Sequence, residues 1–140
     1  MRADELQLVS FRVSGRLYGI DIMQVHQVLQ AGHPVPAPGM PEHILGMTEV
    51  RGRLIAVVDL ARLLGLQAGA PPGRYLVVHL PPDRLVALAM DGVEARIRIP
   101  RADLLQRPEE LTSPAVVGAF RAETELGLVL DPERLMGHDS

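Results

Sequence analysis

Short apolar segments separated by turn residues account for most of the chain. Val9, Phe11 and Val13 alternate with polar residues, which is the period-two pattern of a strand with one buried face. Apolar runs rich in β-branched residues predict further strands over 17–20, 45–50, 54–58, 75–80, 85–90 and 93–99. Turn residues recur roughly every eight to twelve positions, so the pattern predicts about five short strands in each half of the chain.

The clearest local pattern is a hairpin in the middle of the chain. Two apolar arms, 45–50 and 54–58, flank the three residues Arg51, Gly52 and Arg53. A glycine at this point can take the positive φ that a tight hairpin turn requires. The hairpin therefore presents an arginine at its tip.

A short helix with a defined start and end is predicted directly after this hairpin. Asp59 can cap a helical turn over 61–64, which Gly65 can end in the left-handed conformation. A similar stretch occurs over 118–137. In both stretches a glycine precedes the aspartate by thirteen residues (Gly46 and Asp59, Gly118 and Asp131), and the pattern x-x-Arg-Leu-apolar-Gly follows the aspartate. We interpret the chain as two related units; the alternative is chance similarity among hydrophobic strands.

One segment has helical rather than strand spacing. Asp21 with Gln24 three positions later resembles a capping pair. The apolar residues that follow share one side of a predicted helix of about two turns, which ends near Gly32: Ile22, Val25, Val28 and Leu29.

The remaining segments read as connections. The prolines of 33–41 exclude helix and ladder, so this is an extended connection, although 38–41 also has the spacing of a proline-rich ligand. The stretch 67–74 is the linker between the two units, and 101–114 is a loop with a helical turn at 102–105. Because closing short sheets hides their edges, we expect two small barrels, 9–66 and 75–137, with strand exchange at the termini as an open alternative. Each is small, which suggests a shared core.

Composition narrows the class of protein. The 140 residues are 47% hydrophobic and 22% charged, and there is no cysteine for disulfides or thiolate metal sites. No apolar run approaches the ~20 residues of a membrane span, and the start lacks the apolar segment of a secretory signal, so we expect a cytoplasmic protein. The net charge of −3 argues against a nucleic-acid-binding barrel pair, the alternative from another class.

Residues for catalysis are not apparent. The sequence lacks a phosphate-binding glycine loop, a nucleophile elbow and a His-Glu-x-x-His motif. The histidines at 26, 33, 43, 79 and 138 have no metal-ligand spacing, so a metal-dependent enzyme is a remote alternative. Four aspartates lie where strands end or helices begin, which capping and turns explain: Asp21, Asp59, Asp91 and Asp131. We expect no catalytic residue, metal or cofactor, and hence a binding module.

Three segments resemble the CheW-like family of bacterial chemotaxis coupling proteins. These are 18–28, the proline-rich connection, and 46–60 with its Arg-Gly and Val-Asp-Leu motifs. In the second half, 90–93 and 128–131 also fit the family's pattern. The resemblance therefore covers nearly the whole chain and implies a single CheW-like domain over 1–140.

The resemblance implies a mainly β fold of two SH3-like five-stranded β-barrels packed on a shared hydrophobic core, with short helices. It also implies a non-catalytic adaptor that bridges the regulatory domain of a CheA-type histidine kinase and the cytoplasmic tip of chemoreceptors. Such an adaptor is recruited to membrane-associated receptor arrays without inserting into the membrane. A CheW variant that binds receptors without coupling the kinase is the alternative.

By position, the resemblance also implies a receptor-binding groove, although it does not identify the residues that contact the kinase. The groove would be formed by Ile22, Val25 and Gln27, by Met47, Arg51 and Gly52, and by Gly92 and Val93. A groove of apolar residues beside a guanidinium suits a helix with an acidic or amide side chain; the alternative for Arg51 is a solvated turn.

One position of this groove departs from the family's pattern. Glu49 stands where the family has asparagine, two residues from Arg51. A pair between these two exposed charges would contribute only ~0–1 kcal/mol, so we expect it to tune binding rather than abolish it.

Overall fold

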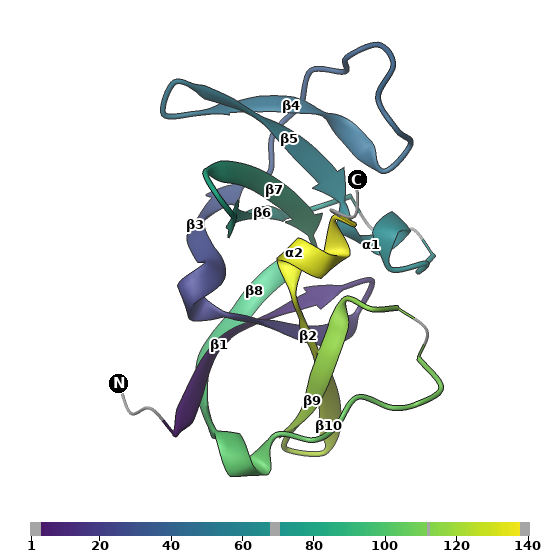
Figure 1. Cartoon of the computed structure of the whole chain (residues 1–140). Coiled ribbons are helices and arrows are strands. Elements are labelled where there is room, and N and C mark those ends of the chain that lie inside the picture. Colours follow the sequence, from purple (N-terminus) through teal and green to yellow (C-terminus); the bar gives the residue numbers. More distant parts are fainter. Residues whose placement is uncertain (1–3, 68–70, 112, 138–140) are drawn as a thin grey trace.

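The computed structural model describes residues 4–67, 71–111 and 113–137, which form two five-stranded sheets and a few short helical turns (Figure 1). Sheet A has the order β8–β1–β2–β10–β9: β1 (Glu5–Val13), β2 (Arg16–Asp21), β8 (Gly92–Pro100), β9 (Val116–Ala122) and β10 (Glu125–Leu130). Sheet B has the order β3–β6–β7–β5–β4: β3 (Val25–Gln30), β4 (Ile44–Val50), β5 (Arg53–Asp59), β6 (Arg74–Leu80) and β7 (Arg84–Met90).

The described residues also contain four helical turns of three or four residues. Three connect strands, namely the 3₁₀ turns η1 (Ile22–Gln24) and η2 (Arg101–Asp103) and the α-helical turn α1 (Leu60–Leu63), and the fourth, α2 (Pro132–Leu135), follows β10. The predicted strands and the predicted turns after Asp59 and near 102–105 are confirmed. The connection 33–41 forms no helix and contributes only one bridge residue, Val35.

Each sheet is closed into a barrel by a bridge between its two edges. In sheet B, the chain leaving β3 reaches Val35, whose backbone exchanges hydrogen bonds of 2.9 and 2.8 Å with Met47 of β4. In sheet A, the chain leaving β8 reaches Leu105, which exchanges hydrogen bonds of 2.9 and 3.0 Å with Ala119 of β9. The prediction of a mainly β fold of two five-stranded barrels is confirmed.

The predicted helix over 22–32 is wrong. The Asp21 side chain accepts a hydrogen bond from the Met23 amide (2.9 Å) and caps only the single turn η1. The chain then pairs with β6, and His26 is an extra residue of a β-bulge in that ladder. A bulge shifts the strand alternation by one residue, so apolar positions in β3 acquire three-residue spacing and imitate a helix face.

The boundaries expected for two consecutive barrels, 9–66 and 75–137, are not those of the sheets. The chain crosses from sheet A to sheet B between β2 and β3, and returns between β7 and β8. Each half therefore gives two strands to one sheet and three to the other. The turn predicted at Asp91 and Gly92 is this second crossing and not a hairpin, because β8 pairs with β1.

The largest apolar cluster lies between the two sheets and includes residues from both. β1 alternates its side chains, so that Val9 and Phe11 belong to this shared core while Leu6 and Leu8 belong to a smaller cluster of sheet A. Sheet B contributes residues such as Leu88, which is fully buried in the shared core. The predicted shared core is thus confirmed.

The two units predicted from the repeat have matching structures. Each ends in a strand that pairs in parallel with the other unit's second strand: β10 with β2 and β5 with β7. Each then ends in a capped helical turn followed by a positive-φ glycine, Gly65 (φ 72°) or Gly137 (φ 59°). A residue in β4, β5 or their turn therefore has a counterpart 72 positions later, as Asp59 has in Asp131.

Candidate functional site

The tip of the β4–β5 hairpin is a two-residue turn that presents Arg51 to solvent. Arg51 has φ 50° and Gly52 has φ 80°, and two successive positive φ values match the right-handed twist of hairpin strands. Both residues are exposed, as is Glu49 before them, while Met47 is half-buried. Local backbone geometry therefore fixes where the guanidinium leaves the sheet.

The other predicted groove residues of sheet B lie on η1 and β3. Ile22 and Val25 are half-buried and pack against the shared core. The side-chain oxygen of Gln27 is buried and has no hydrogen-bond partner among the described residues. An acceptor in this state bears the free-energy cost of desolvation without a compensating hydrogen bond.

Electrostatics link β3 to the hairpin tip. Burial lowers the pKa of His26, and the charges of His79, Arg51 and Arg53 lower it further. The His26 and His79 rings contact each other edge to face, with centroids 5.0 Å apart. The hairpin tip is therefore close enough to β3 for its arginines to act on the His26 charge.

Gly92 and Val93 lie apart from these residues, in sheet A. They begin β8, where Gly92 pairs with Arg12 and Val93 pairs with Phe11. Val93 is 37% exposed, which is high for a valine flanked by a core strand. The structure thus places seven of the nine predicted residues on η1, β3 and the β4–β5 hairpin, and these two after the crossing from β7.

Glu49 and Arg51 do not form an ion pair in the described part of the chain. Both project from the exposed end of the hairpin, where two long side chains lose entropy on pairing and gain little Coulomb energy. The Arg51 guanidinium is therefore not neutralised by the carboxylate that replaces the family's asparagine. The effect of Glu49 on receptor binding stays a prediction.

The four aspartates that resemble catalytic carboxylates accept backbone hydrogen bonds. Asp21 accepts from Met23 (2.9 Å), Asp59 accepts from Arg62 (3.3 Å) and Asp131 accepts from Glu133 (3.0 Å). Asp91 accepts from Ser14 (3.1 Å) and Gly15 (2.9 Å). Capping and turn formation account for all four, as the sequence predicts.

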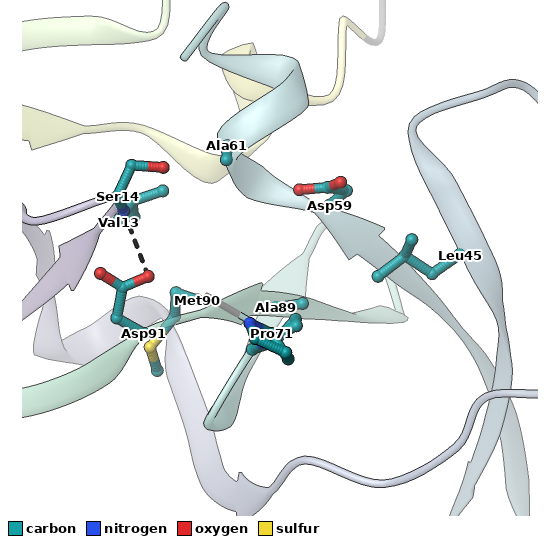
Figure 2. Close-up of a pocket in the computed structure, with 10 residues that line it drawn as sticks. Val13, Ser14, Leu45, Asp59, Ala61, Pro71, Ala89, Met90 and Asp91 are labelled. Carbon is teal, nitrogen blue, oxygen red and sulfur yellow. Dashed lines mark hydrogen bonds between the residues drawn. The ribbon is translucent and has the colours of Figure 1, made fainter. Parts of the chain in front are cut away.

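A half-open cavity of about 250 Å³ lies where the two sheets meet (Figure 2). Val13 and Ser14 line it from sheet A, and Asp59, Met90 and Asp91 belong to sheet B and to the crossing. Figure 2 shows the Asp91 carboxylate turned toward the Ser14 backbone amide rather than into open space. Because both carboxylates are engaged with backbone, this cavity offers no group poised for acid–base chemistry.

Residues 4–67, 71–111 and 113–137 lack two further features. No three histidine, aspartate or glutamate side chains converge there in an arrangement that would hold a metal ion. None of the helices described there is long and apolar enough to cross a membrane.

Sequence reasoning missed that His26 lies close to His79, Arg51 and Arg53. The predicted helix over this segment hides the pairing of β3 with β6, which brings His26 into contact with His79. A signal was present in the repeat, because the equivalent positions in the second unit also carry charged residues, Glu94 and Glu125.

Comparisons with known proteins agree with this architecture. The model of the CheW-like domain family matches residues 7–140. Protein FrzA of Myxococcus xanthus is 33% identical over 126 residues, which cover 89% of this chain and 74% of that protein. Chemotaxis protein CheW of Rhizobium meliloti (strain 1021) is 28% identical over 104 residues, which cover 74% of this chain and 67% of that protein.

A solved structure extends the similarity to three dimensions. The scaffolding protein TtCheW from Thermoanaerobacter tengcongensis has a TM-score of 0.86 and 25% sequence identity, and the match covers 94% of this chain and 92% of that one. The family match spans almost every residue that the structure describes, including both crossings between the sheets. The chain therefore belongs to the CheW-like domain family.

Proposed function

We propose that this protein is a non-catalytic adaptor that couples chemoreceptors to a CheA-type histidine kinase in a bacterial signalling array. The observation that carries the proposal is the hairpin tip: the exposed guanidinium of Arg51, which has no ion-pair partner among the described residues, is held by a fixed turn on the same hairpin as the half-buried Met47. Membership of the CheW-like family supports it, and the relatives named chemotaxis protein CheW and scaffolding protein TtCheW point the same way.

The receptor contact is assigned to the groove residues Ile22, Val25, Gln27, Met47, Glu49, Arg51, Gly52, Gly92 and Val93. The cytoplasmic tip of a chemoreceptor is a helical bundle, and a helix binds such a surface through one apolar face. Met47 and Val25 supply apolar contact, while the planar fork of Arg51 suits a carboxylate or amide on the helix.

The kinase contact is assigned to the regulatory domain of the kinase, which has a fold of the same family. An adaptor of this kind works in the cytoplasm and reaches the membrane only through the receptors. It performs no reaction; its output is the relative position of two other proteins.

Parallel capture experiments test this function. The immobilised protein is offered a purified receptor-tip fragment, the kinase regulatory domain, or both, and we expect each to be retained alone and together. Retention of the receptor fragment without the kinase domain would identify a receptor-only binder. Retention of neither would overturn the proposal, and retention of duplex DNA at low salt only would favour the nucleic-acid alternative.

A further inference from the structure

Each sheet contains a β-bulge, and the two bulges lie at equivalent positions. In the β1–β8 ladder the register shifts between Ser10 and Phe11, which leaves Glu94 as the extra residue. In the β3–β6 ladder the register shifts between Val25 and Gln27, which leaves His26 as the extra residue. Glu94 and His26 therefore occupy the same place in their sheets.

In sheet A, this place is part of an ion-pair cluster. Arg12 donates from Nε to Glu94 (2.8 Å) and through both terminal nitrogens to Glu125 (2.6 and 2.9 Å). The paired forks raise the pKa of Arg12 and lower the pKa of Glu125. Arg12 of β1 thus links strands β8 and β10 through its ion pairs with Glu94 and Glu125.

In sheet B, the same positions hold only basic residues. His79 corresponds to Arg12, since it pairs with Leu85 as Arg12 pairs with Leu17 in the equivalent hairpin. Arg53 is the first residue of β5, as Glu125 is of β10.

The turn before each of these strands follows the same rule. Arg51 (φ 50°) occupies the positive-φ turn position that Glu123 (φ 57°) occupies in the other unit. One arginine and three glutamates in sheet A are therefore replaced by two histidines and two arginines in sheet B.

Few other charges face this cluster from the elements around it. Arg53 bonds the backbone oxygen of Asp83 (3.0 Å), and its Nη1 is 3.7 Å from the Asp83 carboxylate, which is 90% exposed. Glu49 on β4 and Arg84 at the start of β7 are the remaining charged residues nearby in sequence. Sheet B thus has one weakly held carboxylate where sheet A has two close ones.

We propose that a carboxylate side chain of the receptor tip binds between His26, His79 and the arginines Arg51 and Arg53. The receptor would thus supply to sheet B the kind of acidic partner that the chain's own glutamates supply in sheet A. This inference rests on the proposed function and specifies the chemistry of the receptor residue: an exposed aspartate or glutamate on a helix. Charge complementarity carries it, because His26 contacts His79 and is close enough to Arg51 and Arg53 for their charges to act on it. Among the described residues, the carboxylate that pairs with any of the four is the exposed Asp83.

The site is expected to be sensitive to protons. In the free protein, burial and the basic neighbours lower the pKa of His26, which favours the neutral imidazole. A bound carboxylate reverses that influence and favours the charged imidazole. Affinity for the receptor should therefore rise as pH falls from about 7.5 to about 5.5, a range in which aspartate and glutamate, with ordinary pKa values of about 4, stay ionised.

The test is a binding titration of the receptor-tip fragment against the whole protein and its variants. We expect Arg53→Glu and His26→Glu each to weaken binding about tenfold, the scale of a desolvated charge pair, and both to remove the rise at low pH. Arg96→Glu, on an exposed position of β8, is the matched control and should leave binding unchanged. Normal binding by both sheet B variants would overturn the inference while leaving the proposed function intact.

A second measurement needs no partner. The triple variant His26→Glu, Arg53→Glu, His79→Arg installs the sheet A residues in sheet B, and should raise the melting temperature by closing the cluster in cis. A lower melting temperature would show that the two sheets are not equivalent here and would contradict the inference. If the wild-type protein binds no receptor fragment, that result contradicts the proposed function itself. It also excludes the receptor as the source of the carboxylate.

Discussion

The Asp91 carboxylate and the Ser14 backbone amide are joined by a 3.1 Å hydrogen bond although the two residues are 77 positions apart. The second carboxylate oxygen accepts from Gly15 (2.9 Å), so one side chain holds the whole β1–β2 turn. The Ser14 hydroxyl in turn donates to the backbone oxygen of Gln67 (2.8 Å). The β1–β2 turn of sheet A is thus hydrogen-bonded both to Asp91, where the chain leaves sheet B, and to Gln67, which follows α1.

Removing this carboxylate should loosen the junction between the sheets. Asp91→Ala leaves two backbone amides without their acceptor, and we expect the free energy of unfolding to fall by about 1 kcal/mol. Urea denaturation measures the change. Glu109→Ala, at an exposed loop position, serves as control and should stay within about 0.5 kcal/mol of wild type; an equal loss in both variants would contradict the assigned role.

Gly46 should not tolerate a side chain. Its φ is 150°, and a Cβ atom there would lie 2.6 Å from the Val35 backbone oxygen, which forms the bridge that closes sheet B. Gly46→Ala should therefore cost about 2 kcal/mol or more through strain and displacement of that bridge. Gly32→Ala is the matched control, because a Cβ there meets nothing within 4 Å. Thermal unfolding of the two variants distinguishes them, and similar melting temperatures would count against the bridge.

The Arg12 cluster should give sheet A an acid-sensitive component of stability. Arg12 lowers the pKa of Glu125 below its ordinary value of 4.5, so the ionised form is favoured by folding. This contribution is complete above about pH 4.5 and is lost as pH falls through the lowered folded-state pKa. Wild type should therefore exceed Glu125→Gln in urea midpoint at pH 7, and the gap should narrow toward pH 3. A gap independent of pH would exclude the proton linkage.

Charge reversal at the hairpin tip should separate binding from folding. Arg51→Glu inverts a fully exposed side chain without touching the core, so the circular dichroism spectrum and melting temperature should remain close to wild type. Receptor-tip capture should fall about tenfold or more, since a like charge then faces the partner's carboxylate. Arg98→Glu, an exposed arginine of β8, should capture normally. Undiminished capture by Arg51→Glu would remove this residue from the site.

The strands and caps were predictable because their signals are local. Alternation over 9–13 and an aspartate or glycine at each end of a helical turn follow from backbone geometry within a few residues. Repetition of the hairpin and cap around Asp59 and Asp131 added independent support. These features needed no knowledge of what lies opposite them in space.

Pairing partners could not be predicted in the same way. Nothing near Asp91 distinguishes a hairpin turn from a crossing between sheets, because the choice depends on β1, which offers β8 a free edge. The bulge at His26 likewise depends on the register with β6, and without it the spacing of β3 looks helical. The same error hid the proximity of His26 to Arg51, so the basic cluster emerged only from the fold.

The crossing of the chain between sheets has a consequence for dividing the protein. A chain cut after Gln67 would yield one fragment with β1–β5 and another with β6–β10, and neither would contain a complete sheet. The fragments would not be autonomous domains; each would expose the apolar faces that the other covers. When mixed, the two fragments should reassemble into the complete fold. The fold would then behave as a split protein, in which recovery of the folded structure reports that the two fragments have associated.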